Sequence, residues 1–235
     1  MDPLIRDYLA KLEFGELQQH RKMGAAPLLT AASEGPDYLA LKTAMERRLL
    51  RVTEVSTGGS VPELKVVNTA PMPVLLLDGE ELAGAKQNRV LNTTILLKEN
   101  SETVIPVSCT EQGRWAYSSK EFADSGVVAS PRIRSSKAAG VTASLAQSRR
   151  YSSDQAEVWQ AIHRLCDDSG TSSSTGAMRD VFESKGGDLD QYLEAFGNVP
   201  KQRGVLVFVN GQAVGFDVVS REPAYAELHR KLVKS

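Results

Sequence analysis

The chain contains 235 residues, of which 41% are hydrophobic and 24% are charged. This length and composition are typical of a globular protein with a sizeable core, and we treat residues 1–235 as a single domain. The formal net charge of -1 argues against a broad basic surface for duplex nucleic acid or for an anionic membrane. We therefore expect neither partner, and an anionic ligand would have to be bound by a local group of side chains.

The sequence also indicates a compartment. No apolar run approaches the length of a membrane span, and the first residues lack the basic and then apolar pattern of a signal peptide. The two cysteines, Cys109 and Cys166, fall in a predicted strand and a predicted helix, which favours reduced thiols over a disulfide. We expect a cytoplasmic protein.

Residues 1–50 are expected to be mainly helical. Asp2 and Pro3 resemble a helix start, with an N-cap followed by proline at the first helical position, and apolar residues then recur at helical spacing until Gly15. A second amphipathic helix is predicted from about Pro36 to Leu49.

Residues 51–115 are predicted to form the β core. Runs rich in Val, Ile, Leu and Thr are separated by Gly, Pro, Asn and Asp at intervals typical of an antiparallel sheet. The predicted strands are 51–55, 61–68, 73–77, 90–97 and 103–109. Because Pro106 lacks a backbone N–H, we expect the last strand to lie at a sheet edge or to contain a bulge.

Residues 116–152 are rich in Ser, Ala, Gly and Arg and are predicted to be a long connection. We consider two interpretations of this segment. It is either a solvated linker or a lid whose arginines close over an anionic ligand.

Residues 153–235 are expected to form an α/β C-terminal part. A capping box at 152–155 begins a helix with an apolar stripe, and His163 lies beside that stripe as a boundary residue rather than a ligand. The segment 169–176, Ser-Gly-Thr-Ser-Ser-Ser-Thr-Gly, precedes a helical run over 178–183. It could accept a phosphate at a helix start, but we favour a linker that caps the helix.

The clearest local pattern lies near the C-terminus. Two apolar runs flank Asn210 and Gly211, which predicts a β-hairpin with a type I′ turn, and an amphipathic helix follows over 222–233. Together the elements predict an α+β fold with a mostly antiparallel, sandwich-like β-sheet core flanked by helices, and with a C-terminal helical segment and β-hairpin.

Two polar segments lie at the ends of predicted strands, where binding and catalytic residues tend to be found. They are Asp-Gly-Glu-Glu-Leu (78–82) with Gly-Ala-Lys-Gln-Asn-Arg (84–89), and Ser-Cys-Thr-Glu-Gln-Gly-Arg-Trp (108–115). Adjacent strand residues point to opposite faces, so Glu80 and Glu81 cannot both face one site. A carboxylate near Lys86 or Arg89 could be a general base, a metal ligand or a salt-bridge partner.

Strand alternation places Lys86 and Asn88 on one side and Gln87 and Arg89 on the other. Amides and a guanidinium suit recognition of phosphate, ribose hydroxyls or a base edge. The alternative is a polar connection between two strands with no ligand.

The second segment offers similar alternatives. Trp115 could stack on an aromatic ligand ring with Arg114 on its phosphates, or it could be a core Trp beside an arginine at a strand end. Cys109 shares a strand face with apolar residues, which favours burial over a reactive thiolate. The common enzyme motifs, including Gly-rich phosphate loops and His-Glu-x-x-His, do not occur.

The runs 74–89 and 106–115 resemble the ARG and rhodanese-phosphatase-superfamily-associated protein domain, a bacterial and archaeal family named for its genomic association with ADP-ribosylglycohydrolases. The similarity extends to the helix at 158–159, the segment 174–175 and the hairpin 205–217. It implies a role around NAD-derived or ADP-ribosyl metabolites. The matching positions are Glu80, Gly84, Gln87, Asn88, Arg89, Cys109, Glu111, Arg114 and Trp115.

We therefore expect binding, with hydrolytic processing as an extension, of a nucleotide-like anion such as an ADP-ribose or NAD-derived metabolite. In this hypothesis the phosphates are bound by cations, the sugar or base by amides and an aromatic ring, and a carboxylate acts as base or metal ligand. The residues are Arg89, Arg114 and Lys86 as cations, Gln87 and Asn88 as amides, Trp115 as the ring, and Glu80 or Glu111 as the carboxylate. The alternative is a non-catalytic or protein-interaction module whose polar motifs are structural, and no particular cofactor is predicted.

Overall fold

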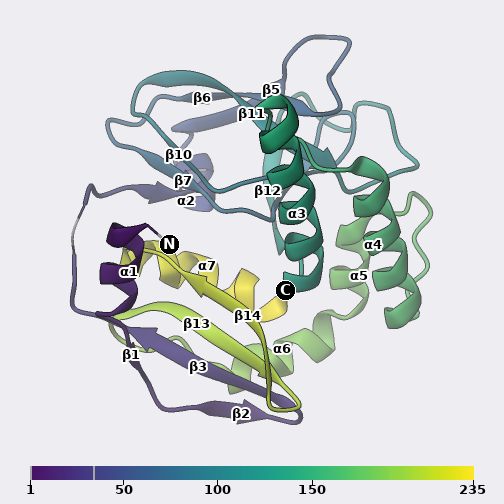
Figure 1. The fold of residues 1–235 in the computed structure, drawn as a ribbon. Coiled ribbons are helices and arrows are strands. Elements are labelled where there is room, and N and C mark those ends of the chain that lie inside the picture. Colours follow the sequence, from purple (N-terminus) through teal and green to yellow (C-terminus); the bar gives the residue numbers. More distant parts are fainter. Residues whose placement is uncertain (1, 34) are drawn as a thin grey trace. The chain divides into compact units, whose positions relative to one another are not determined.

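A computed structural model describes residues 2–33 and 35–235, and it confirms an α+β fold with mostly antiparallel strands (Figure 1). The chain divides into two compact units. The terminal unit combines the residues up to Asp37 with Gly187–Lys234, and the central unit is Tyr38–Gly186. Among the described residues, no helix combines the length and apolar character needed to cross a bilayer.

The terminal unit contains a five-stranded sheet and three helices. The sheet has the order β1-β3-β13-β14, with β2 paired to β3. Its elements are α1 (Pro3–Leu9), β1 (Glu13–Phe14), β2 (Gln18–His20), β3 (Met23–Leu29), α6 (Gly186–Ala195), β13 (Gln202–Val209), β14 (Gln212–Val218) and α7 (Glu222–Lys234). The predicted hairpin is confirmed, because Asn210 and Gly211 have the positive φ angles of 51° and 78° that a type I′ turn requires.

The prediction of a mainly helical segment over residues 1–50 is wrong beyond the first helix. Met23–Leu29 has helix-forming Ala, Leu and Met residues, yet it forms β3 because β13 pairs with it along its length. The second predicted helix is also shorter than expected. It is α2 (Leu41–Glu46), and Leu39–Ala40 before it forms the short strand β4, which is parallel to β7.

The central unit contains a six-stranded sheet of order β12-β8-β9-β11-β6-β5 and a three-stranded sheet of order β10-β7-β4. The remaining strands are β5 (Leu50–Glu54), β6 (Glu63–Asn68), β7 (Val74–Leu76), β8 (Glu80–Gly84), β9 (Arg89–Leu91), β10 (Ile95–Leu97), β11 (Ser101–Cys109) and β12 (Phe122–Val128). The single strand predicted over 90–97 is therefore wrong. The chain leaves one sheet after Leu91 and enters the other at Ile95, and the Asn92 side chain between them donates to the Tyr151 carbonyl.

Pro106 lies in an interior strand, which corrects the expected edge position. Residues Ser101–Pro106 of β11 pair with β6, and Val107–Cys109 pair with β9. The proline therefore sits where the strand changes partner, so its missing N–H interrupts neither ladder in the middle.

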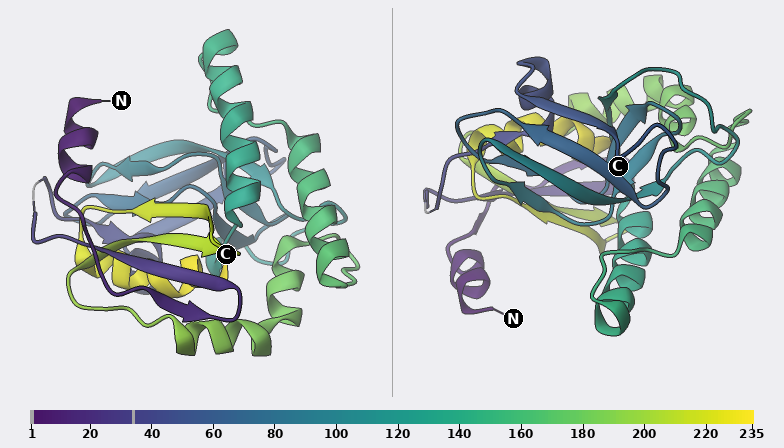
Figure 2. Two further views of the ribbon diagram at one scale, coloured as in Figure 1. Left: turned by 60° about the horizontal axis from the view of Figure 1, so that its bottom comes forward. Right: turned by 90° about the horizontal axis from the view of Figure 1, so that it is seen from above.

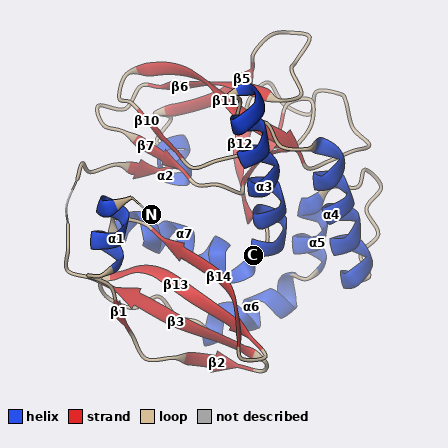
Figure 3. Cartoon of the chain, viewed as in Figure 1, coloured by secondary structure: helices blue, strands red, loops and turns tan. Residues whose placement is uncertain are grey.

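The segment 116–152 is not a solvated linker over most of its length, as Figure 3 shows, and the lid stays a prediction. It contains β12 and the helix α3 (Pro131–Ser148), whose N-cap is Ser130 and whose first residue is proline. This Ser-Pro start followed by alanines is a helix pattern that the Ser and Arg content concealed. The next helix, α4 (Gln155–Ser169), is capped by the Asp154 side chain rather than by Ser152.

The six-stranded sheet buries both faces. One face packs on an inner core that includes Leu82 and Leu91, whereas Val90 on the other face packs with residues of the helices. Those helices are α3, α4 and α5 (Met178–Ser184), and α3 and α4 lie side by side (Figure 2). Side chains of the same strand thus enter two different environments.

Candidate functional site

The register of β8, β9 and β11 decides which polar side chains meet. Arg89 is directly opposite both Leu82 and Cys109, so these three residues share the inner face. Glu81 is opposite Val90 and therefore faces the helices. The expectation that adjacent glutamates diverge is confirmed, since Glu80 Oε2 accepts from Leu77 N whereas Glu81 Oε1 accepts from Thr110 Oγ1.

The Arg89 side chain is fully buried, and only some of its N–H donors have hydrogen-bond partners. Its Nη1 donates to the Gln87 carbonyl at 2.9 Å and to Gln87 Oε1 at 3.0 Å. Among the described residues, none accepts a hydrogen bond from Nε or Nη2, and Nη2 lies 3.9 Å from Glu54 Oε1. Burial lowers the pKa of the guanidinium, against the opposing influence of Cys109 and Glu54. The Nε and Nη2 edge is the one that binds oxyanions with two parallel hydrogen bonds.

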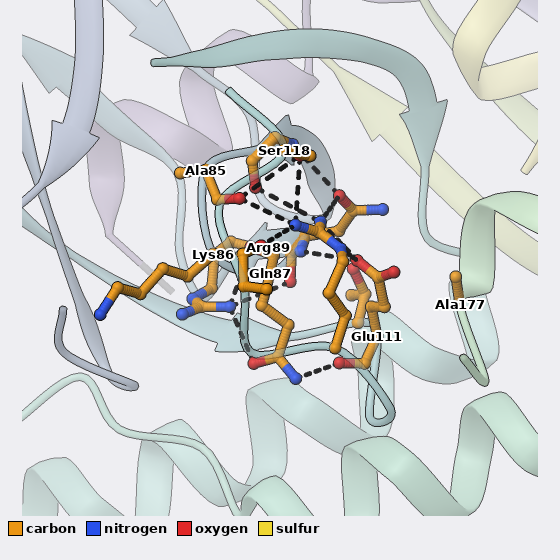
Figure 4. Close-up of polar contacts among 12 residues, drawn as sticks. Ala85, Lys86, Gln87, Arg89, Glu111, Ser118 and Ala177 are labelled. Carbon is orange, nitrogen blue, oxygen red and sulfur yellow. Dashed lines mark hydrogen bonds and ion pairs between the residues drawn. The ribbon is translucent and has the colours of Figure 1, made fainter. Parts of the chain in front are cut away.

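A cationic and aromatic group covers this arginine. The Trp115 ring centroid lies 5.5 Å from Arg89 Cζ and 5.4 Å from Lys86 Nζ. Lys86 Nζ also lies 5.2 Å from the Tyr117 ring and donates to the Gly58 carbonyl at 2.7 Å. Trp115 is 49% exposed and Tyr117 is 53% exposed, so the core-Trp alternative is wrong. Figure 4 shows the Lys86 and Arg89 side chains next to each other.

Arg114 is engaged inside the protein. Its Nε and Nη2 donate to Glu111 Oε2 at 2.9 and 2.6 Å, and its Nη1 donates to the carbonyls of Ala85 and Ala116 at 2.8 and 2.9 Å. Burial tends to raise the pKa of Glu111, but hydrogen bonds from Arg114, Asn88 N and Thr175 outweigh it, and the pKa is lowered. Arg114 thus joins the turn after β11 to the connection between β8 and β9.

The two predicted amides belong to the same network. Gln87 accepts from Arg89 and donates to the Glu111 carbonyl, while Asn88 Oδ1 accepts from Gly84 N and from Arg114 Nη2, both at 3.1 Å. The structure therefore brings Arg89 and Arg114 into one cluster, whereas the Glu80 carboxylate accepts from the backbone of Leu77, just after β7. The ligand roles of all these residues remain predictions.

Sequence reasoning missed Glu81, which has an unusual environment. It is fully buried, and no described residue donates a hydrogen bond to its Oε2. Burial raises its pKa from 4.5 to about 7, although the hydroxyls of Thr110 and Ser125 and the charge of Arg179 on α5 oppose the rise. The sequence alone does not show which of the two glutamates faces the helices, because that depends on the register of β8 against β9.

Within residues 2–33 and 35–235, no group of three or more His, Cys, Asp or Glu side chains could hold a metal ion. No curated protein and no solved structure matches the chain. The family model of the ARG and Rhodanese-Phosphatase-superfamily-associated Protein domain matches residues 11–235, and the chain therefore belongs to this family.

Proposed function

We propose that the central unit binds a nucleotide-like anion, such as an ADP-ribose or NAD-derived metabolite, at the unpaired edge of Arg89. The buried Nε and Nη2 donors support this proposal most directly. Leaving a buried donor unpaired costs about 1–3 kcal/mol, and more when the group is charged. Two oxygens of a phosphate would satisfy both donors at once. The family association with ADP-ribosylglycohydrolases suggests the same class of ligand.

The surroundings of Arg89 suit such a ligand. Lys86 adds a second positive charge beside the guanidinium, and the exposed rings of Trp115 and Tyr117 offer faces on which a base can stack. Glu54 offsets part of this charge. Its separation of 3.9 Å from Nη2 exceeds a hydrogen-bond distance, so this ion pair leaves the Nε and Nη2 donors without an acceptor.

Binding is better supported than hydrolysis. Glu111 Oε2 accepts hydrogen bonds from Asn88 N and Arg114, and its lowered pKa makes it a weak base. Glu80 is buried and its carboxylate accepts from the backbone of Leu77. Neither carboxylate is placed as a general base beside the unpaired edge of Arg89.

The alternative, that the polar motifs are structural, fits one residue well. Arg114 directs its donors to groups of the protein itself, so we assign it a role in holding the turn rather than in binding phosphate. Under the proposal, ligand affinity depends on Arg89 and Lys86 much more than on Arg114.

The test is calorimetric titration of ADP-ribose into the whole chain. We expect Arg89→Lys, which keeps the charge but removes the two-donor edge, to weaken binding by about tenfold or more. Lys86→Ala should weaken binding less, and the exposed Lys120→Ala is the matched control and should bind as the parent does. Circular dichroism and thermal melting verify that each variant is folded. If folded Arg89→Lys binds ADP-ribose as well as the parent, or if the parent does not bind it, the proposal is wrong.

A further inference from the structure

A surface hollow of about 580 Å³ lies in the central unit beside α4, and we call it the α4 pocket. One wall is formed by His163, Cys166 and Asp167, whose spacing of three and four residues places them on one face of the helix. The opposite wall includes Gln112, from the turn after β11, and residues of the hydroxyl-rich loop 171–176. The pocket is thus lined by α4 and by the loop 171–176, which are not part of the proposed anion site.

The two parts of the opposite wall are fixed to each other. Gly113 N donates to the Thr175 carbonyl at 2.7 Å, and Glu111 forms a β-bridge with Ala177. Gly176 lies between the walls, since a Cβ on it would be 3.7 Å from His163 Nε2 and 3.8 Å from Gln112 Cβ. These backbone contacts hold the turn after β11 and the loop 171–176 in fixed positions beside α4.

The side chains that line the pocket favour a neutral, hydroxyl-rich ligand. Gln112, His163 and Asp167 are exposed at this hollow, and within the described chain no residue forms a hydrogen bond or ion pair with their side chains. The lining contains no lysine or arginine. Burial and the nearby charges of Asp167 and Asp180 raise the pKa of Cys166, which keeps the thiol neutral. The local charge disfavours a phosphate, whereas carboxylate and amide oxygens accept hydrogen bonds from sugar hydroxyls.

The pocket is close in sequence to the proposed anion site. Gly113 lines the pocket, and Trp115, only two residues later, covers Arg89. Two extended residues span at most about 7 Å, so the turn 112–115 borders both the α4 pocket and the ring that covers Arg89.

We propose that the α4 pocket binds the terminal sugar of a nucleoside diphosphate sugar, with Asp167 and Gln112 accepting hydrogen bonds from its hydroxyls. This inference rests on the proposed function, because it assigns the diphosphate of the same ligand to Arg89. It defines the ligand class as one with a neutral polyhydroxyl group beyond the phosphates, and it makes Asp167 a specificity-determining residue.

The experiment compares ADP-ribose with ADP, which lacks the terminal sugar, by calorimetry on the whole chain. Asp167→Asn should weaken ADP-ribose binding by about tenfold and leave ADP binding unchanged, since a hydrogen bond to a charged carboxylate becomes one to a neutral amide. Gln112→Ala should act in the same direction. The control is Asp168→Asn, because this adjacent aspartate is exposed like Asp167 but lines a different hollow, between α3 and α4.

The outcomes separate the two proposals. If the parent binds both ligands and Asp167→Asn weakens neither, or weakens both equally, the sugar assignment is overturned while the anion site stands. If the parent binds neither ligand, the proposed function fails and the sugar assignment fails with it. An effect of Asp168→Asn equal to that of Asp167→Asn would also overturn the assignment to this pocket.

Discussion

Replacing Glu81 by Gln should make the central unit more stable at high pH. The carboxylate is fully buried, and its pKa rises from 4.5 to about 7 in the folded protein. Each pKa unit corresponds to about 1.4 kcal/mol, so ionising this group in the folded protein costs about 3 kcal/mol. Glutamine avoids that cost and can still accept the hydrogen bond that Thr110 Oγ1 donates at 2.6 Å.

The pH dependence follows from the direction of the pKa change. Below about pH 4.5 the group is protonated in both folded and unfolded chains, and Glu81 incurs no ionisation cost. As pH rises toward 7, the unfolded chain ionises first, and the parent loses stability relative to Glu81→Gln until the difference reaches about 3 kcal/mol.

Urea unfolding of parent and variant at pH 5 and pH 8 measures this difference directly. The variant should gain little at the lower pH and most of the 3 kcal/mol at the higher one. Glu111→Gln is the control of opposite sign, because the pKa of Glu111 is lowered and its carboxylate stabilises the fold at neutral pH. If Glu81→Gln loses stability equally at both pH values, the argument from burial is wrong.

The remaining predictions concern stability and are measured by urea unfolding at neutral pH. Arg114→Ala should cost about 3 kcal/mol, because it removes the partner of a buried carboxylate, and a cost below about 1 kcal/mol would contradict its structural role. Gly113→Ala should lower the free energy of unfolding by about 1–3 kcal/mol, since a Cβ would lie 3.0 Å from Thr175 Cα. An unchanged urea midpoint would contradict this steric argument. Asp78→Ala should destabilise more than Lys137→Met, because Lys137 is fully buried and would lose its partner, whereas water reaches Asp78. Equal losses would refute that asymmetry.

Local patterns in the sequence were sufficient for several elements. The Asn210-Gly211 turn between two apolar runs predicted β13 and β14, because the required positive φ angles are a property of those two residues. Amphipathic patterns also predict α4 and α7, and the structure confirms both helices. In the candidate site, alternation predicted that Glu80 and Glu81 diverge, and the structure confirms this. The same rule placed Lys86 and Arg89 on opposite sides, which is wrong, because residues 85–88 form a turn and both cations lie near the Trp115 ring.

Other features depend on which distant segment each strand contacts. The sequence of β3 forms a strand because β13 lies beside it, and Pro106 is tolerated in the interior because β11 changes partner there. No local pattern indicated these pairings, since residue periodicity reports the backbone state of a segment but not its neighbour.

The sequence by itself determined the α+β class, the family and the polar segments around Arg89 and Glu111, because these are properties of residue type and short-range spacing. Tertiary structure alone decided that the Arg89 edge is buried without a hydrogen-bond acceptor, that Glu81 rather than Glu80 faces the helices, and that α4 meets the loop 171–176 across a pocket. The physical reason is that burial, charge environment and strand register arise from contacts between residues far apart in the chain.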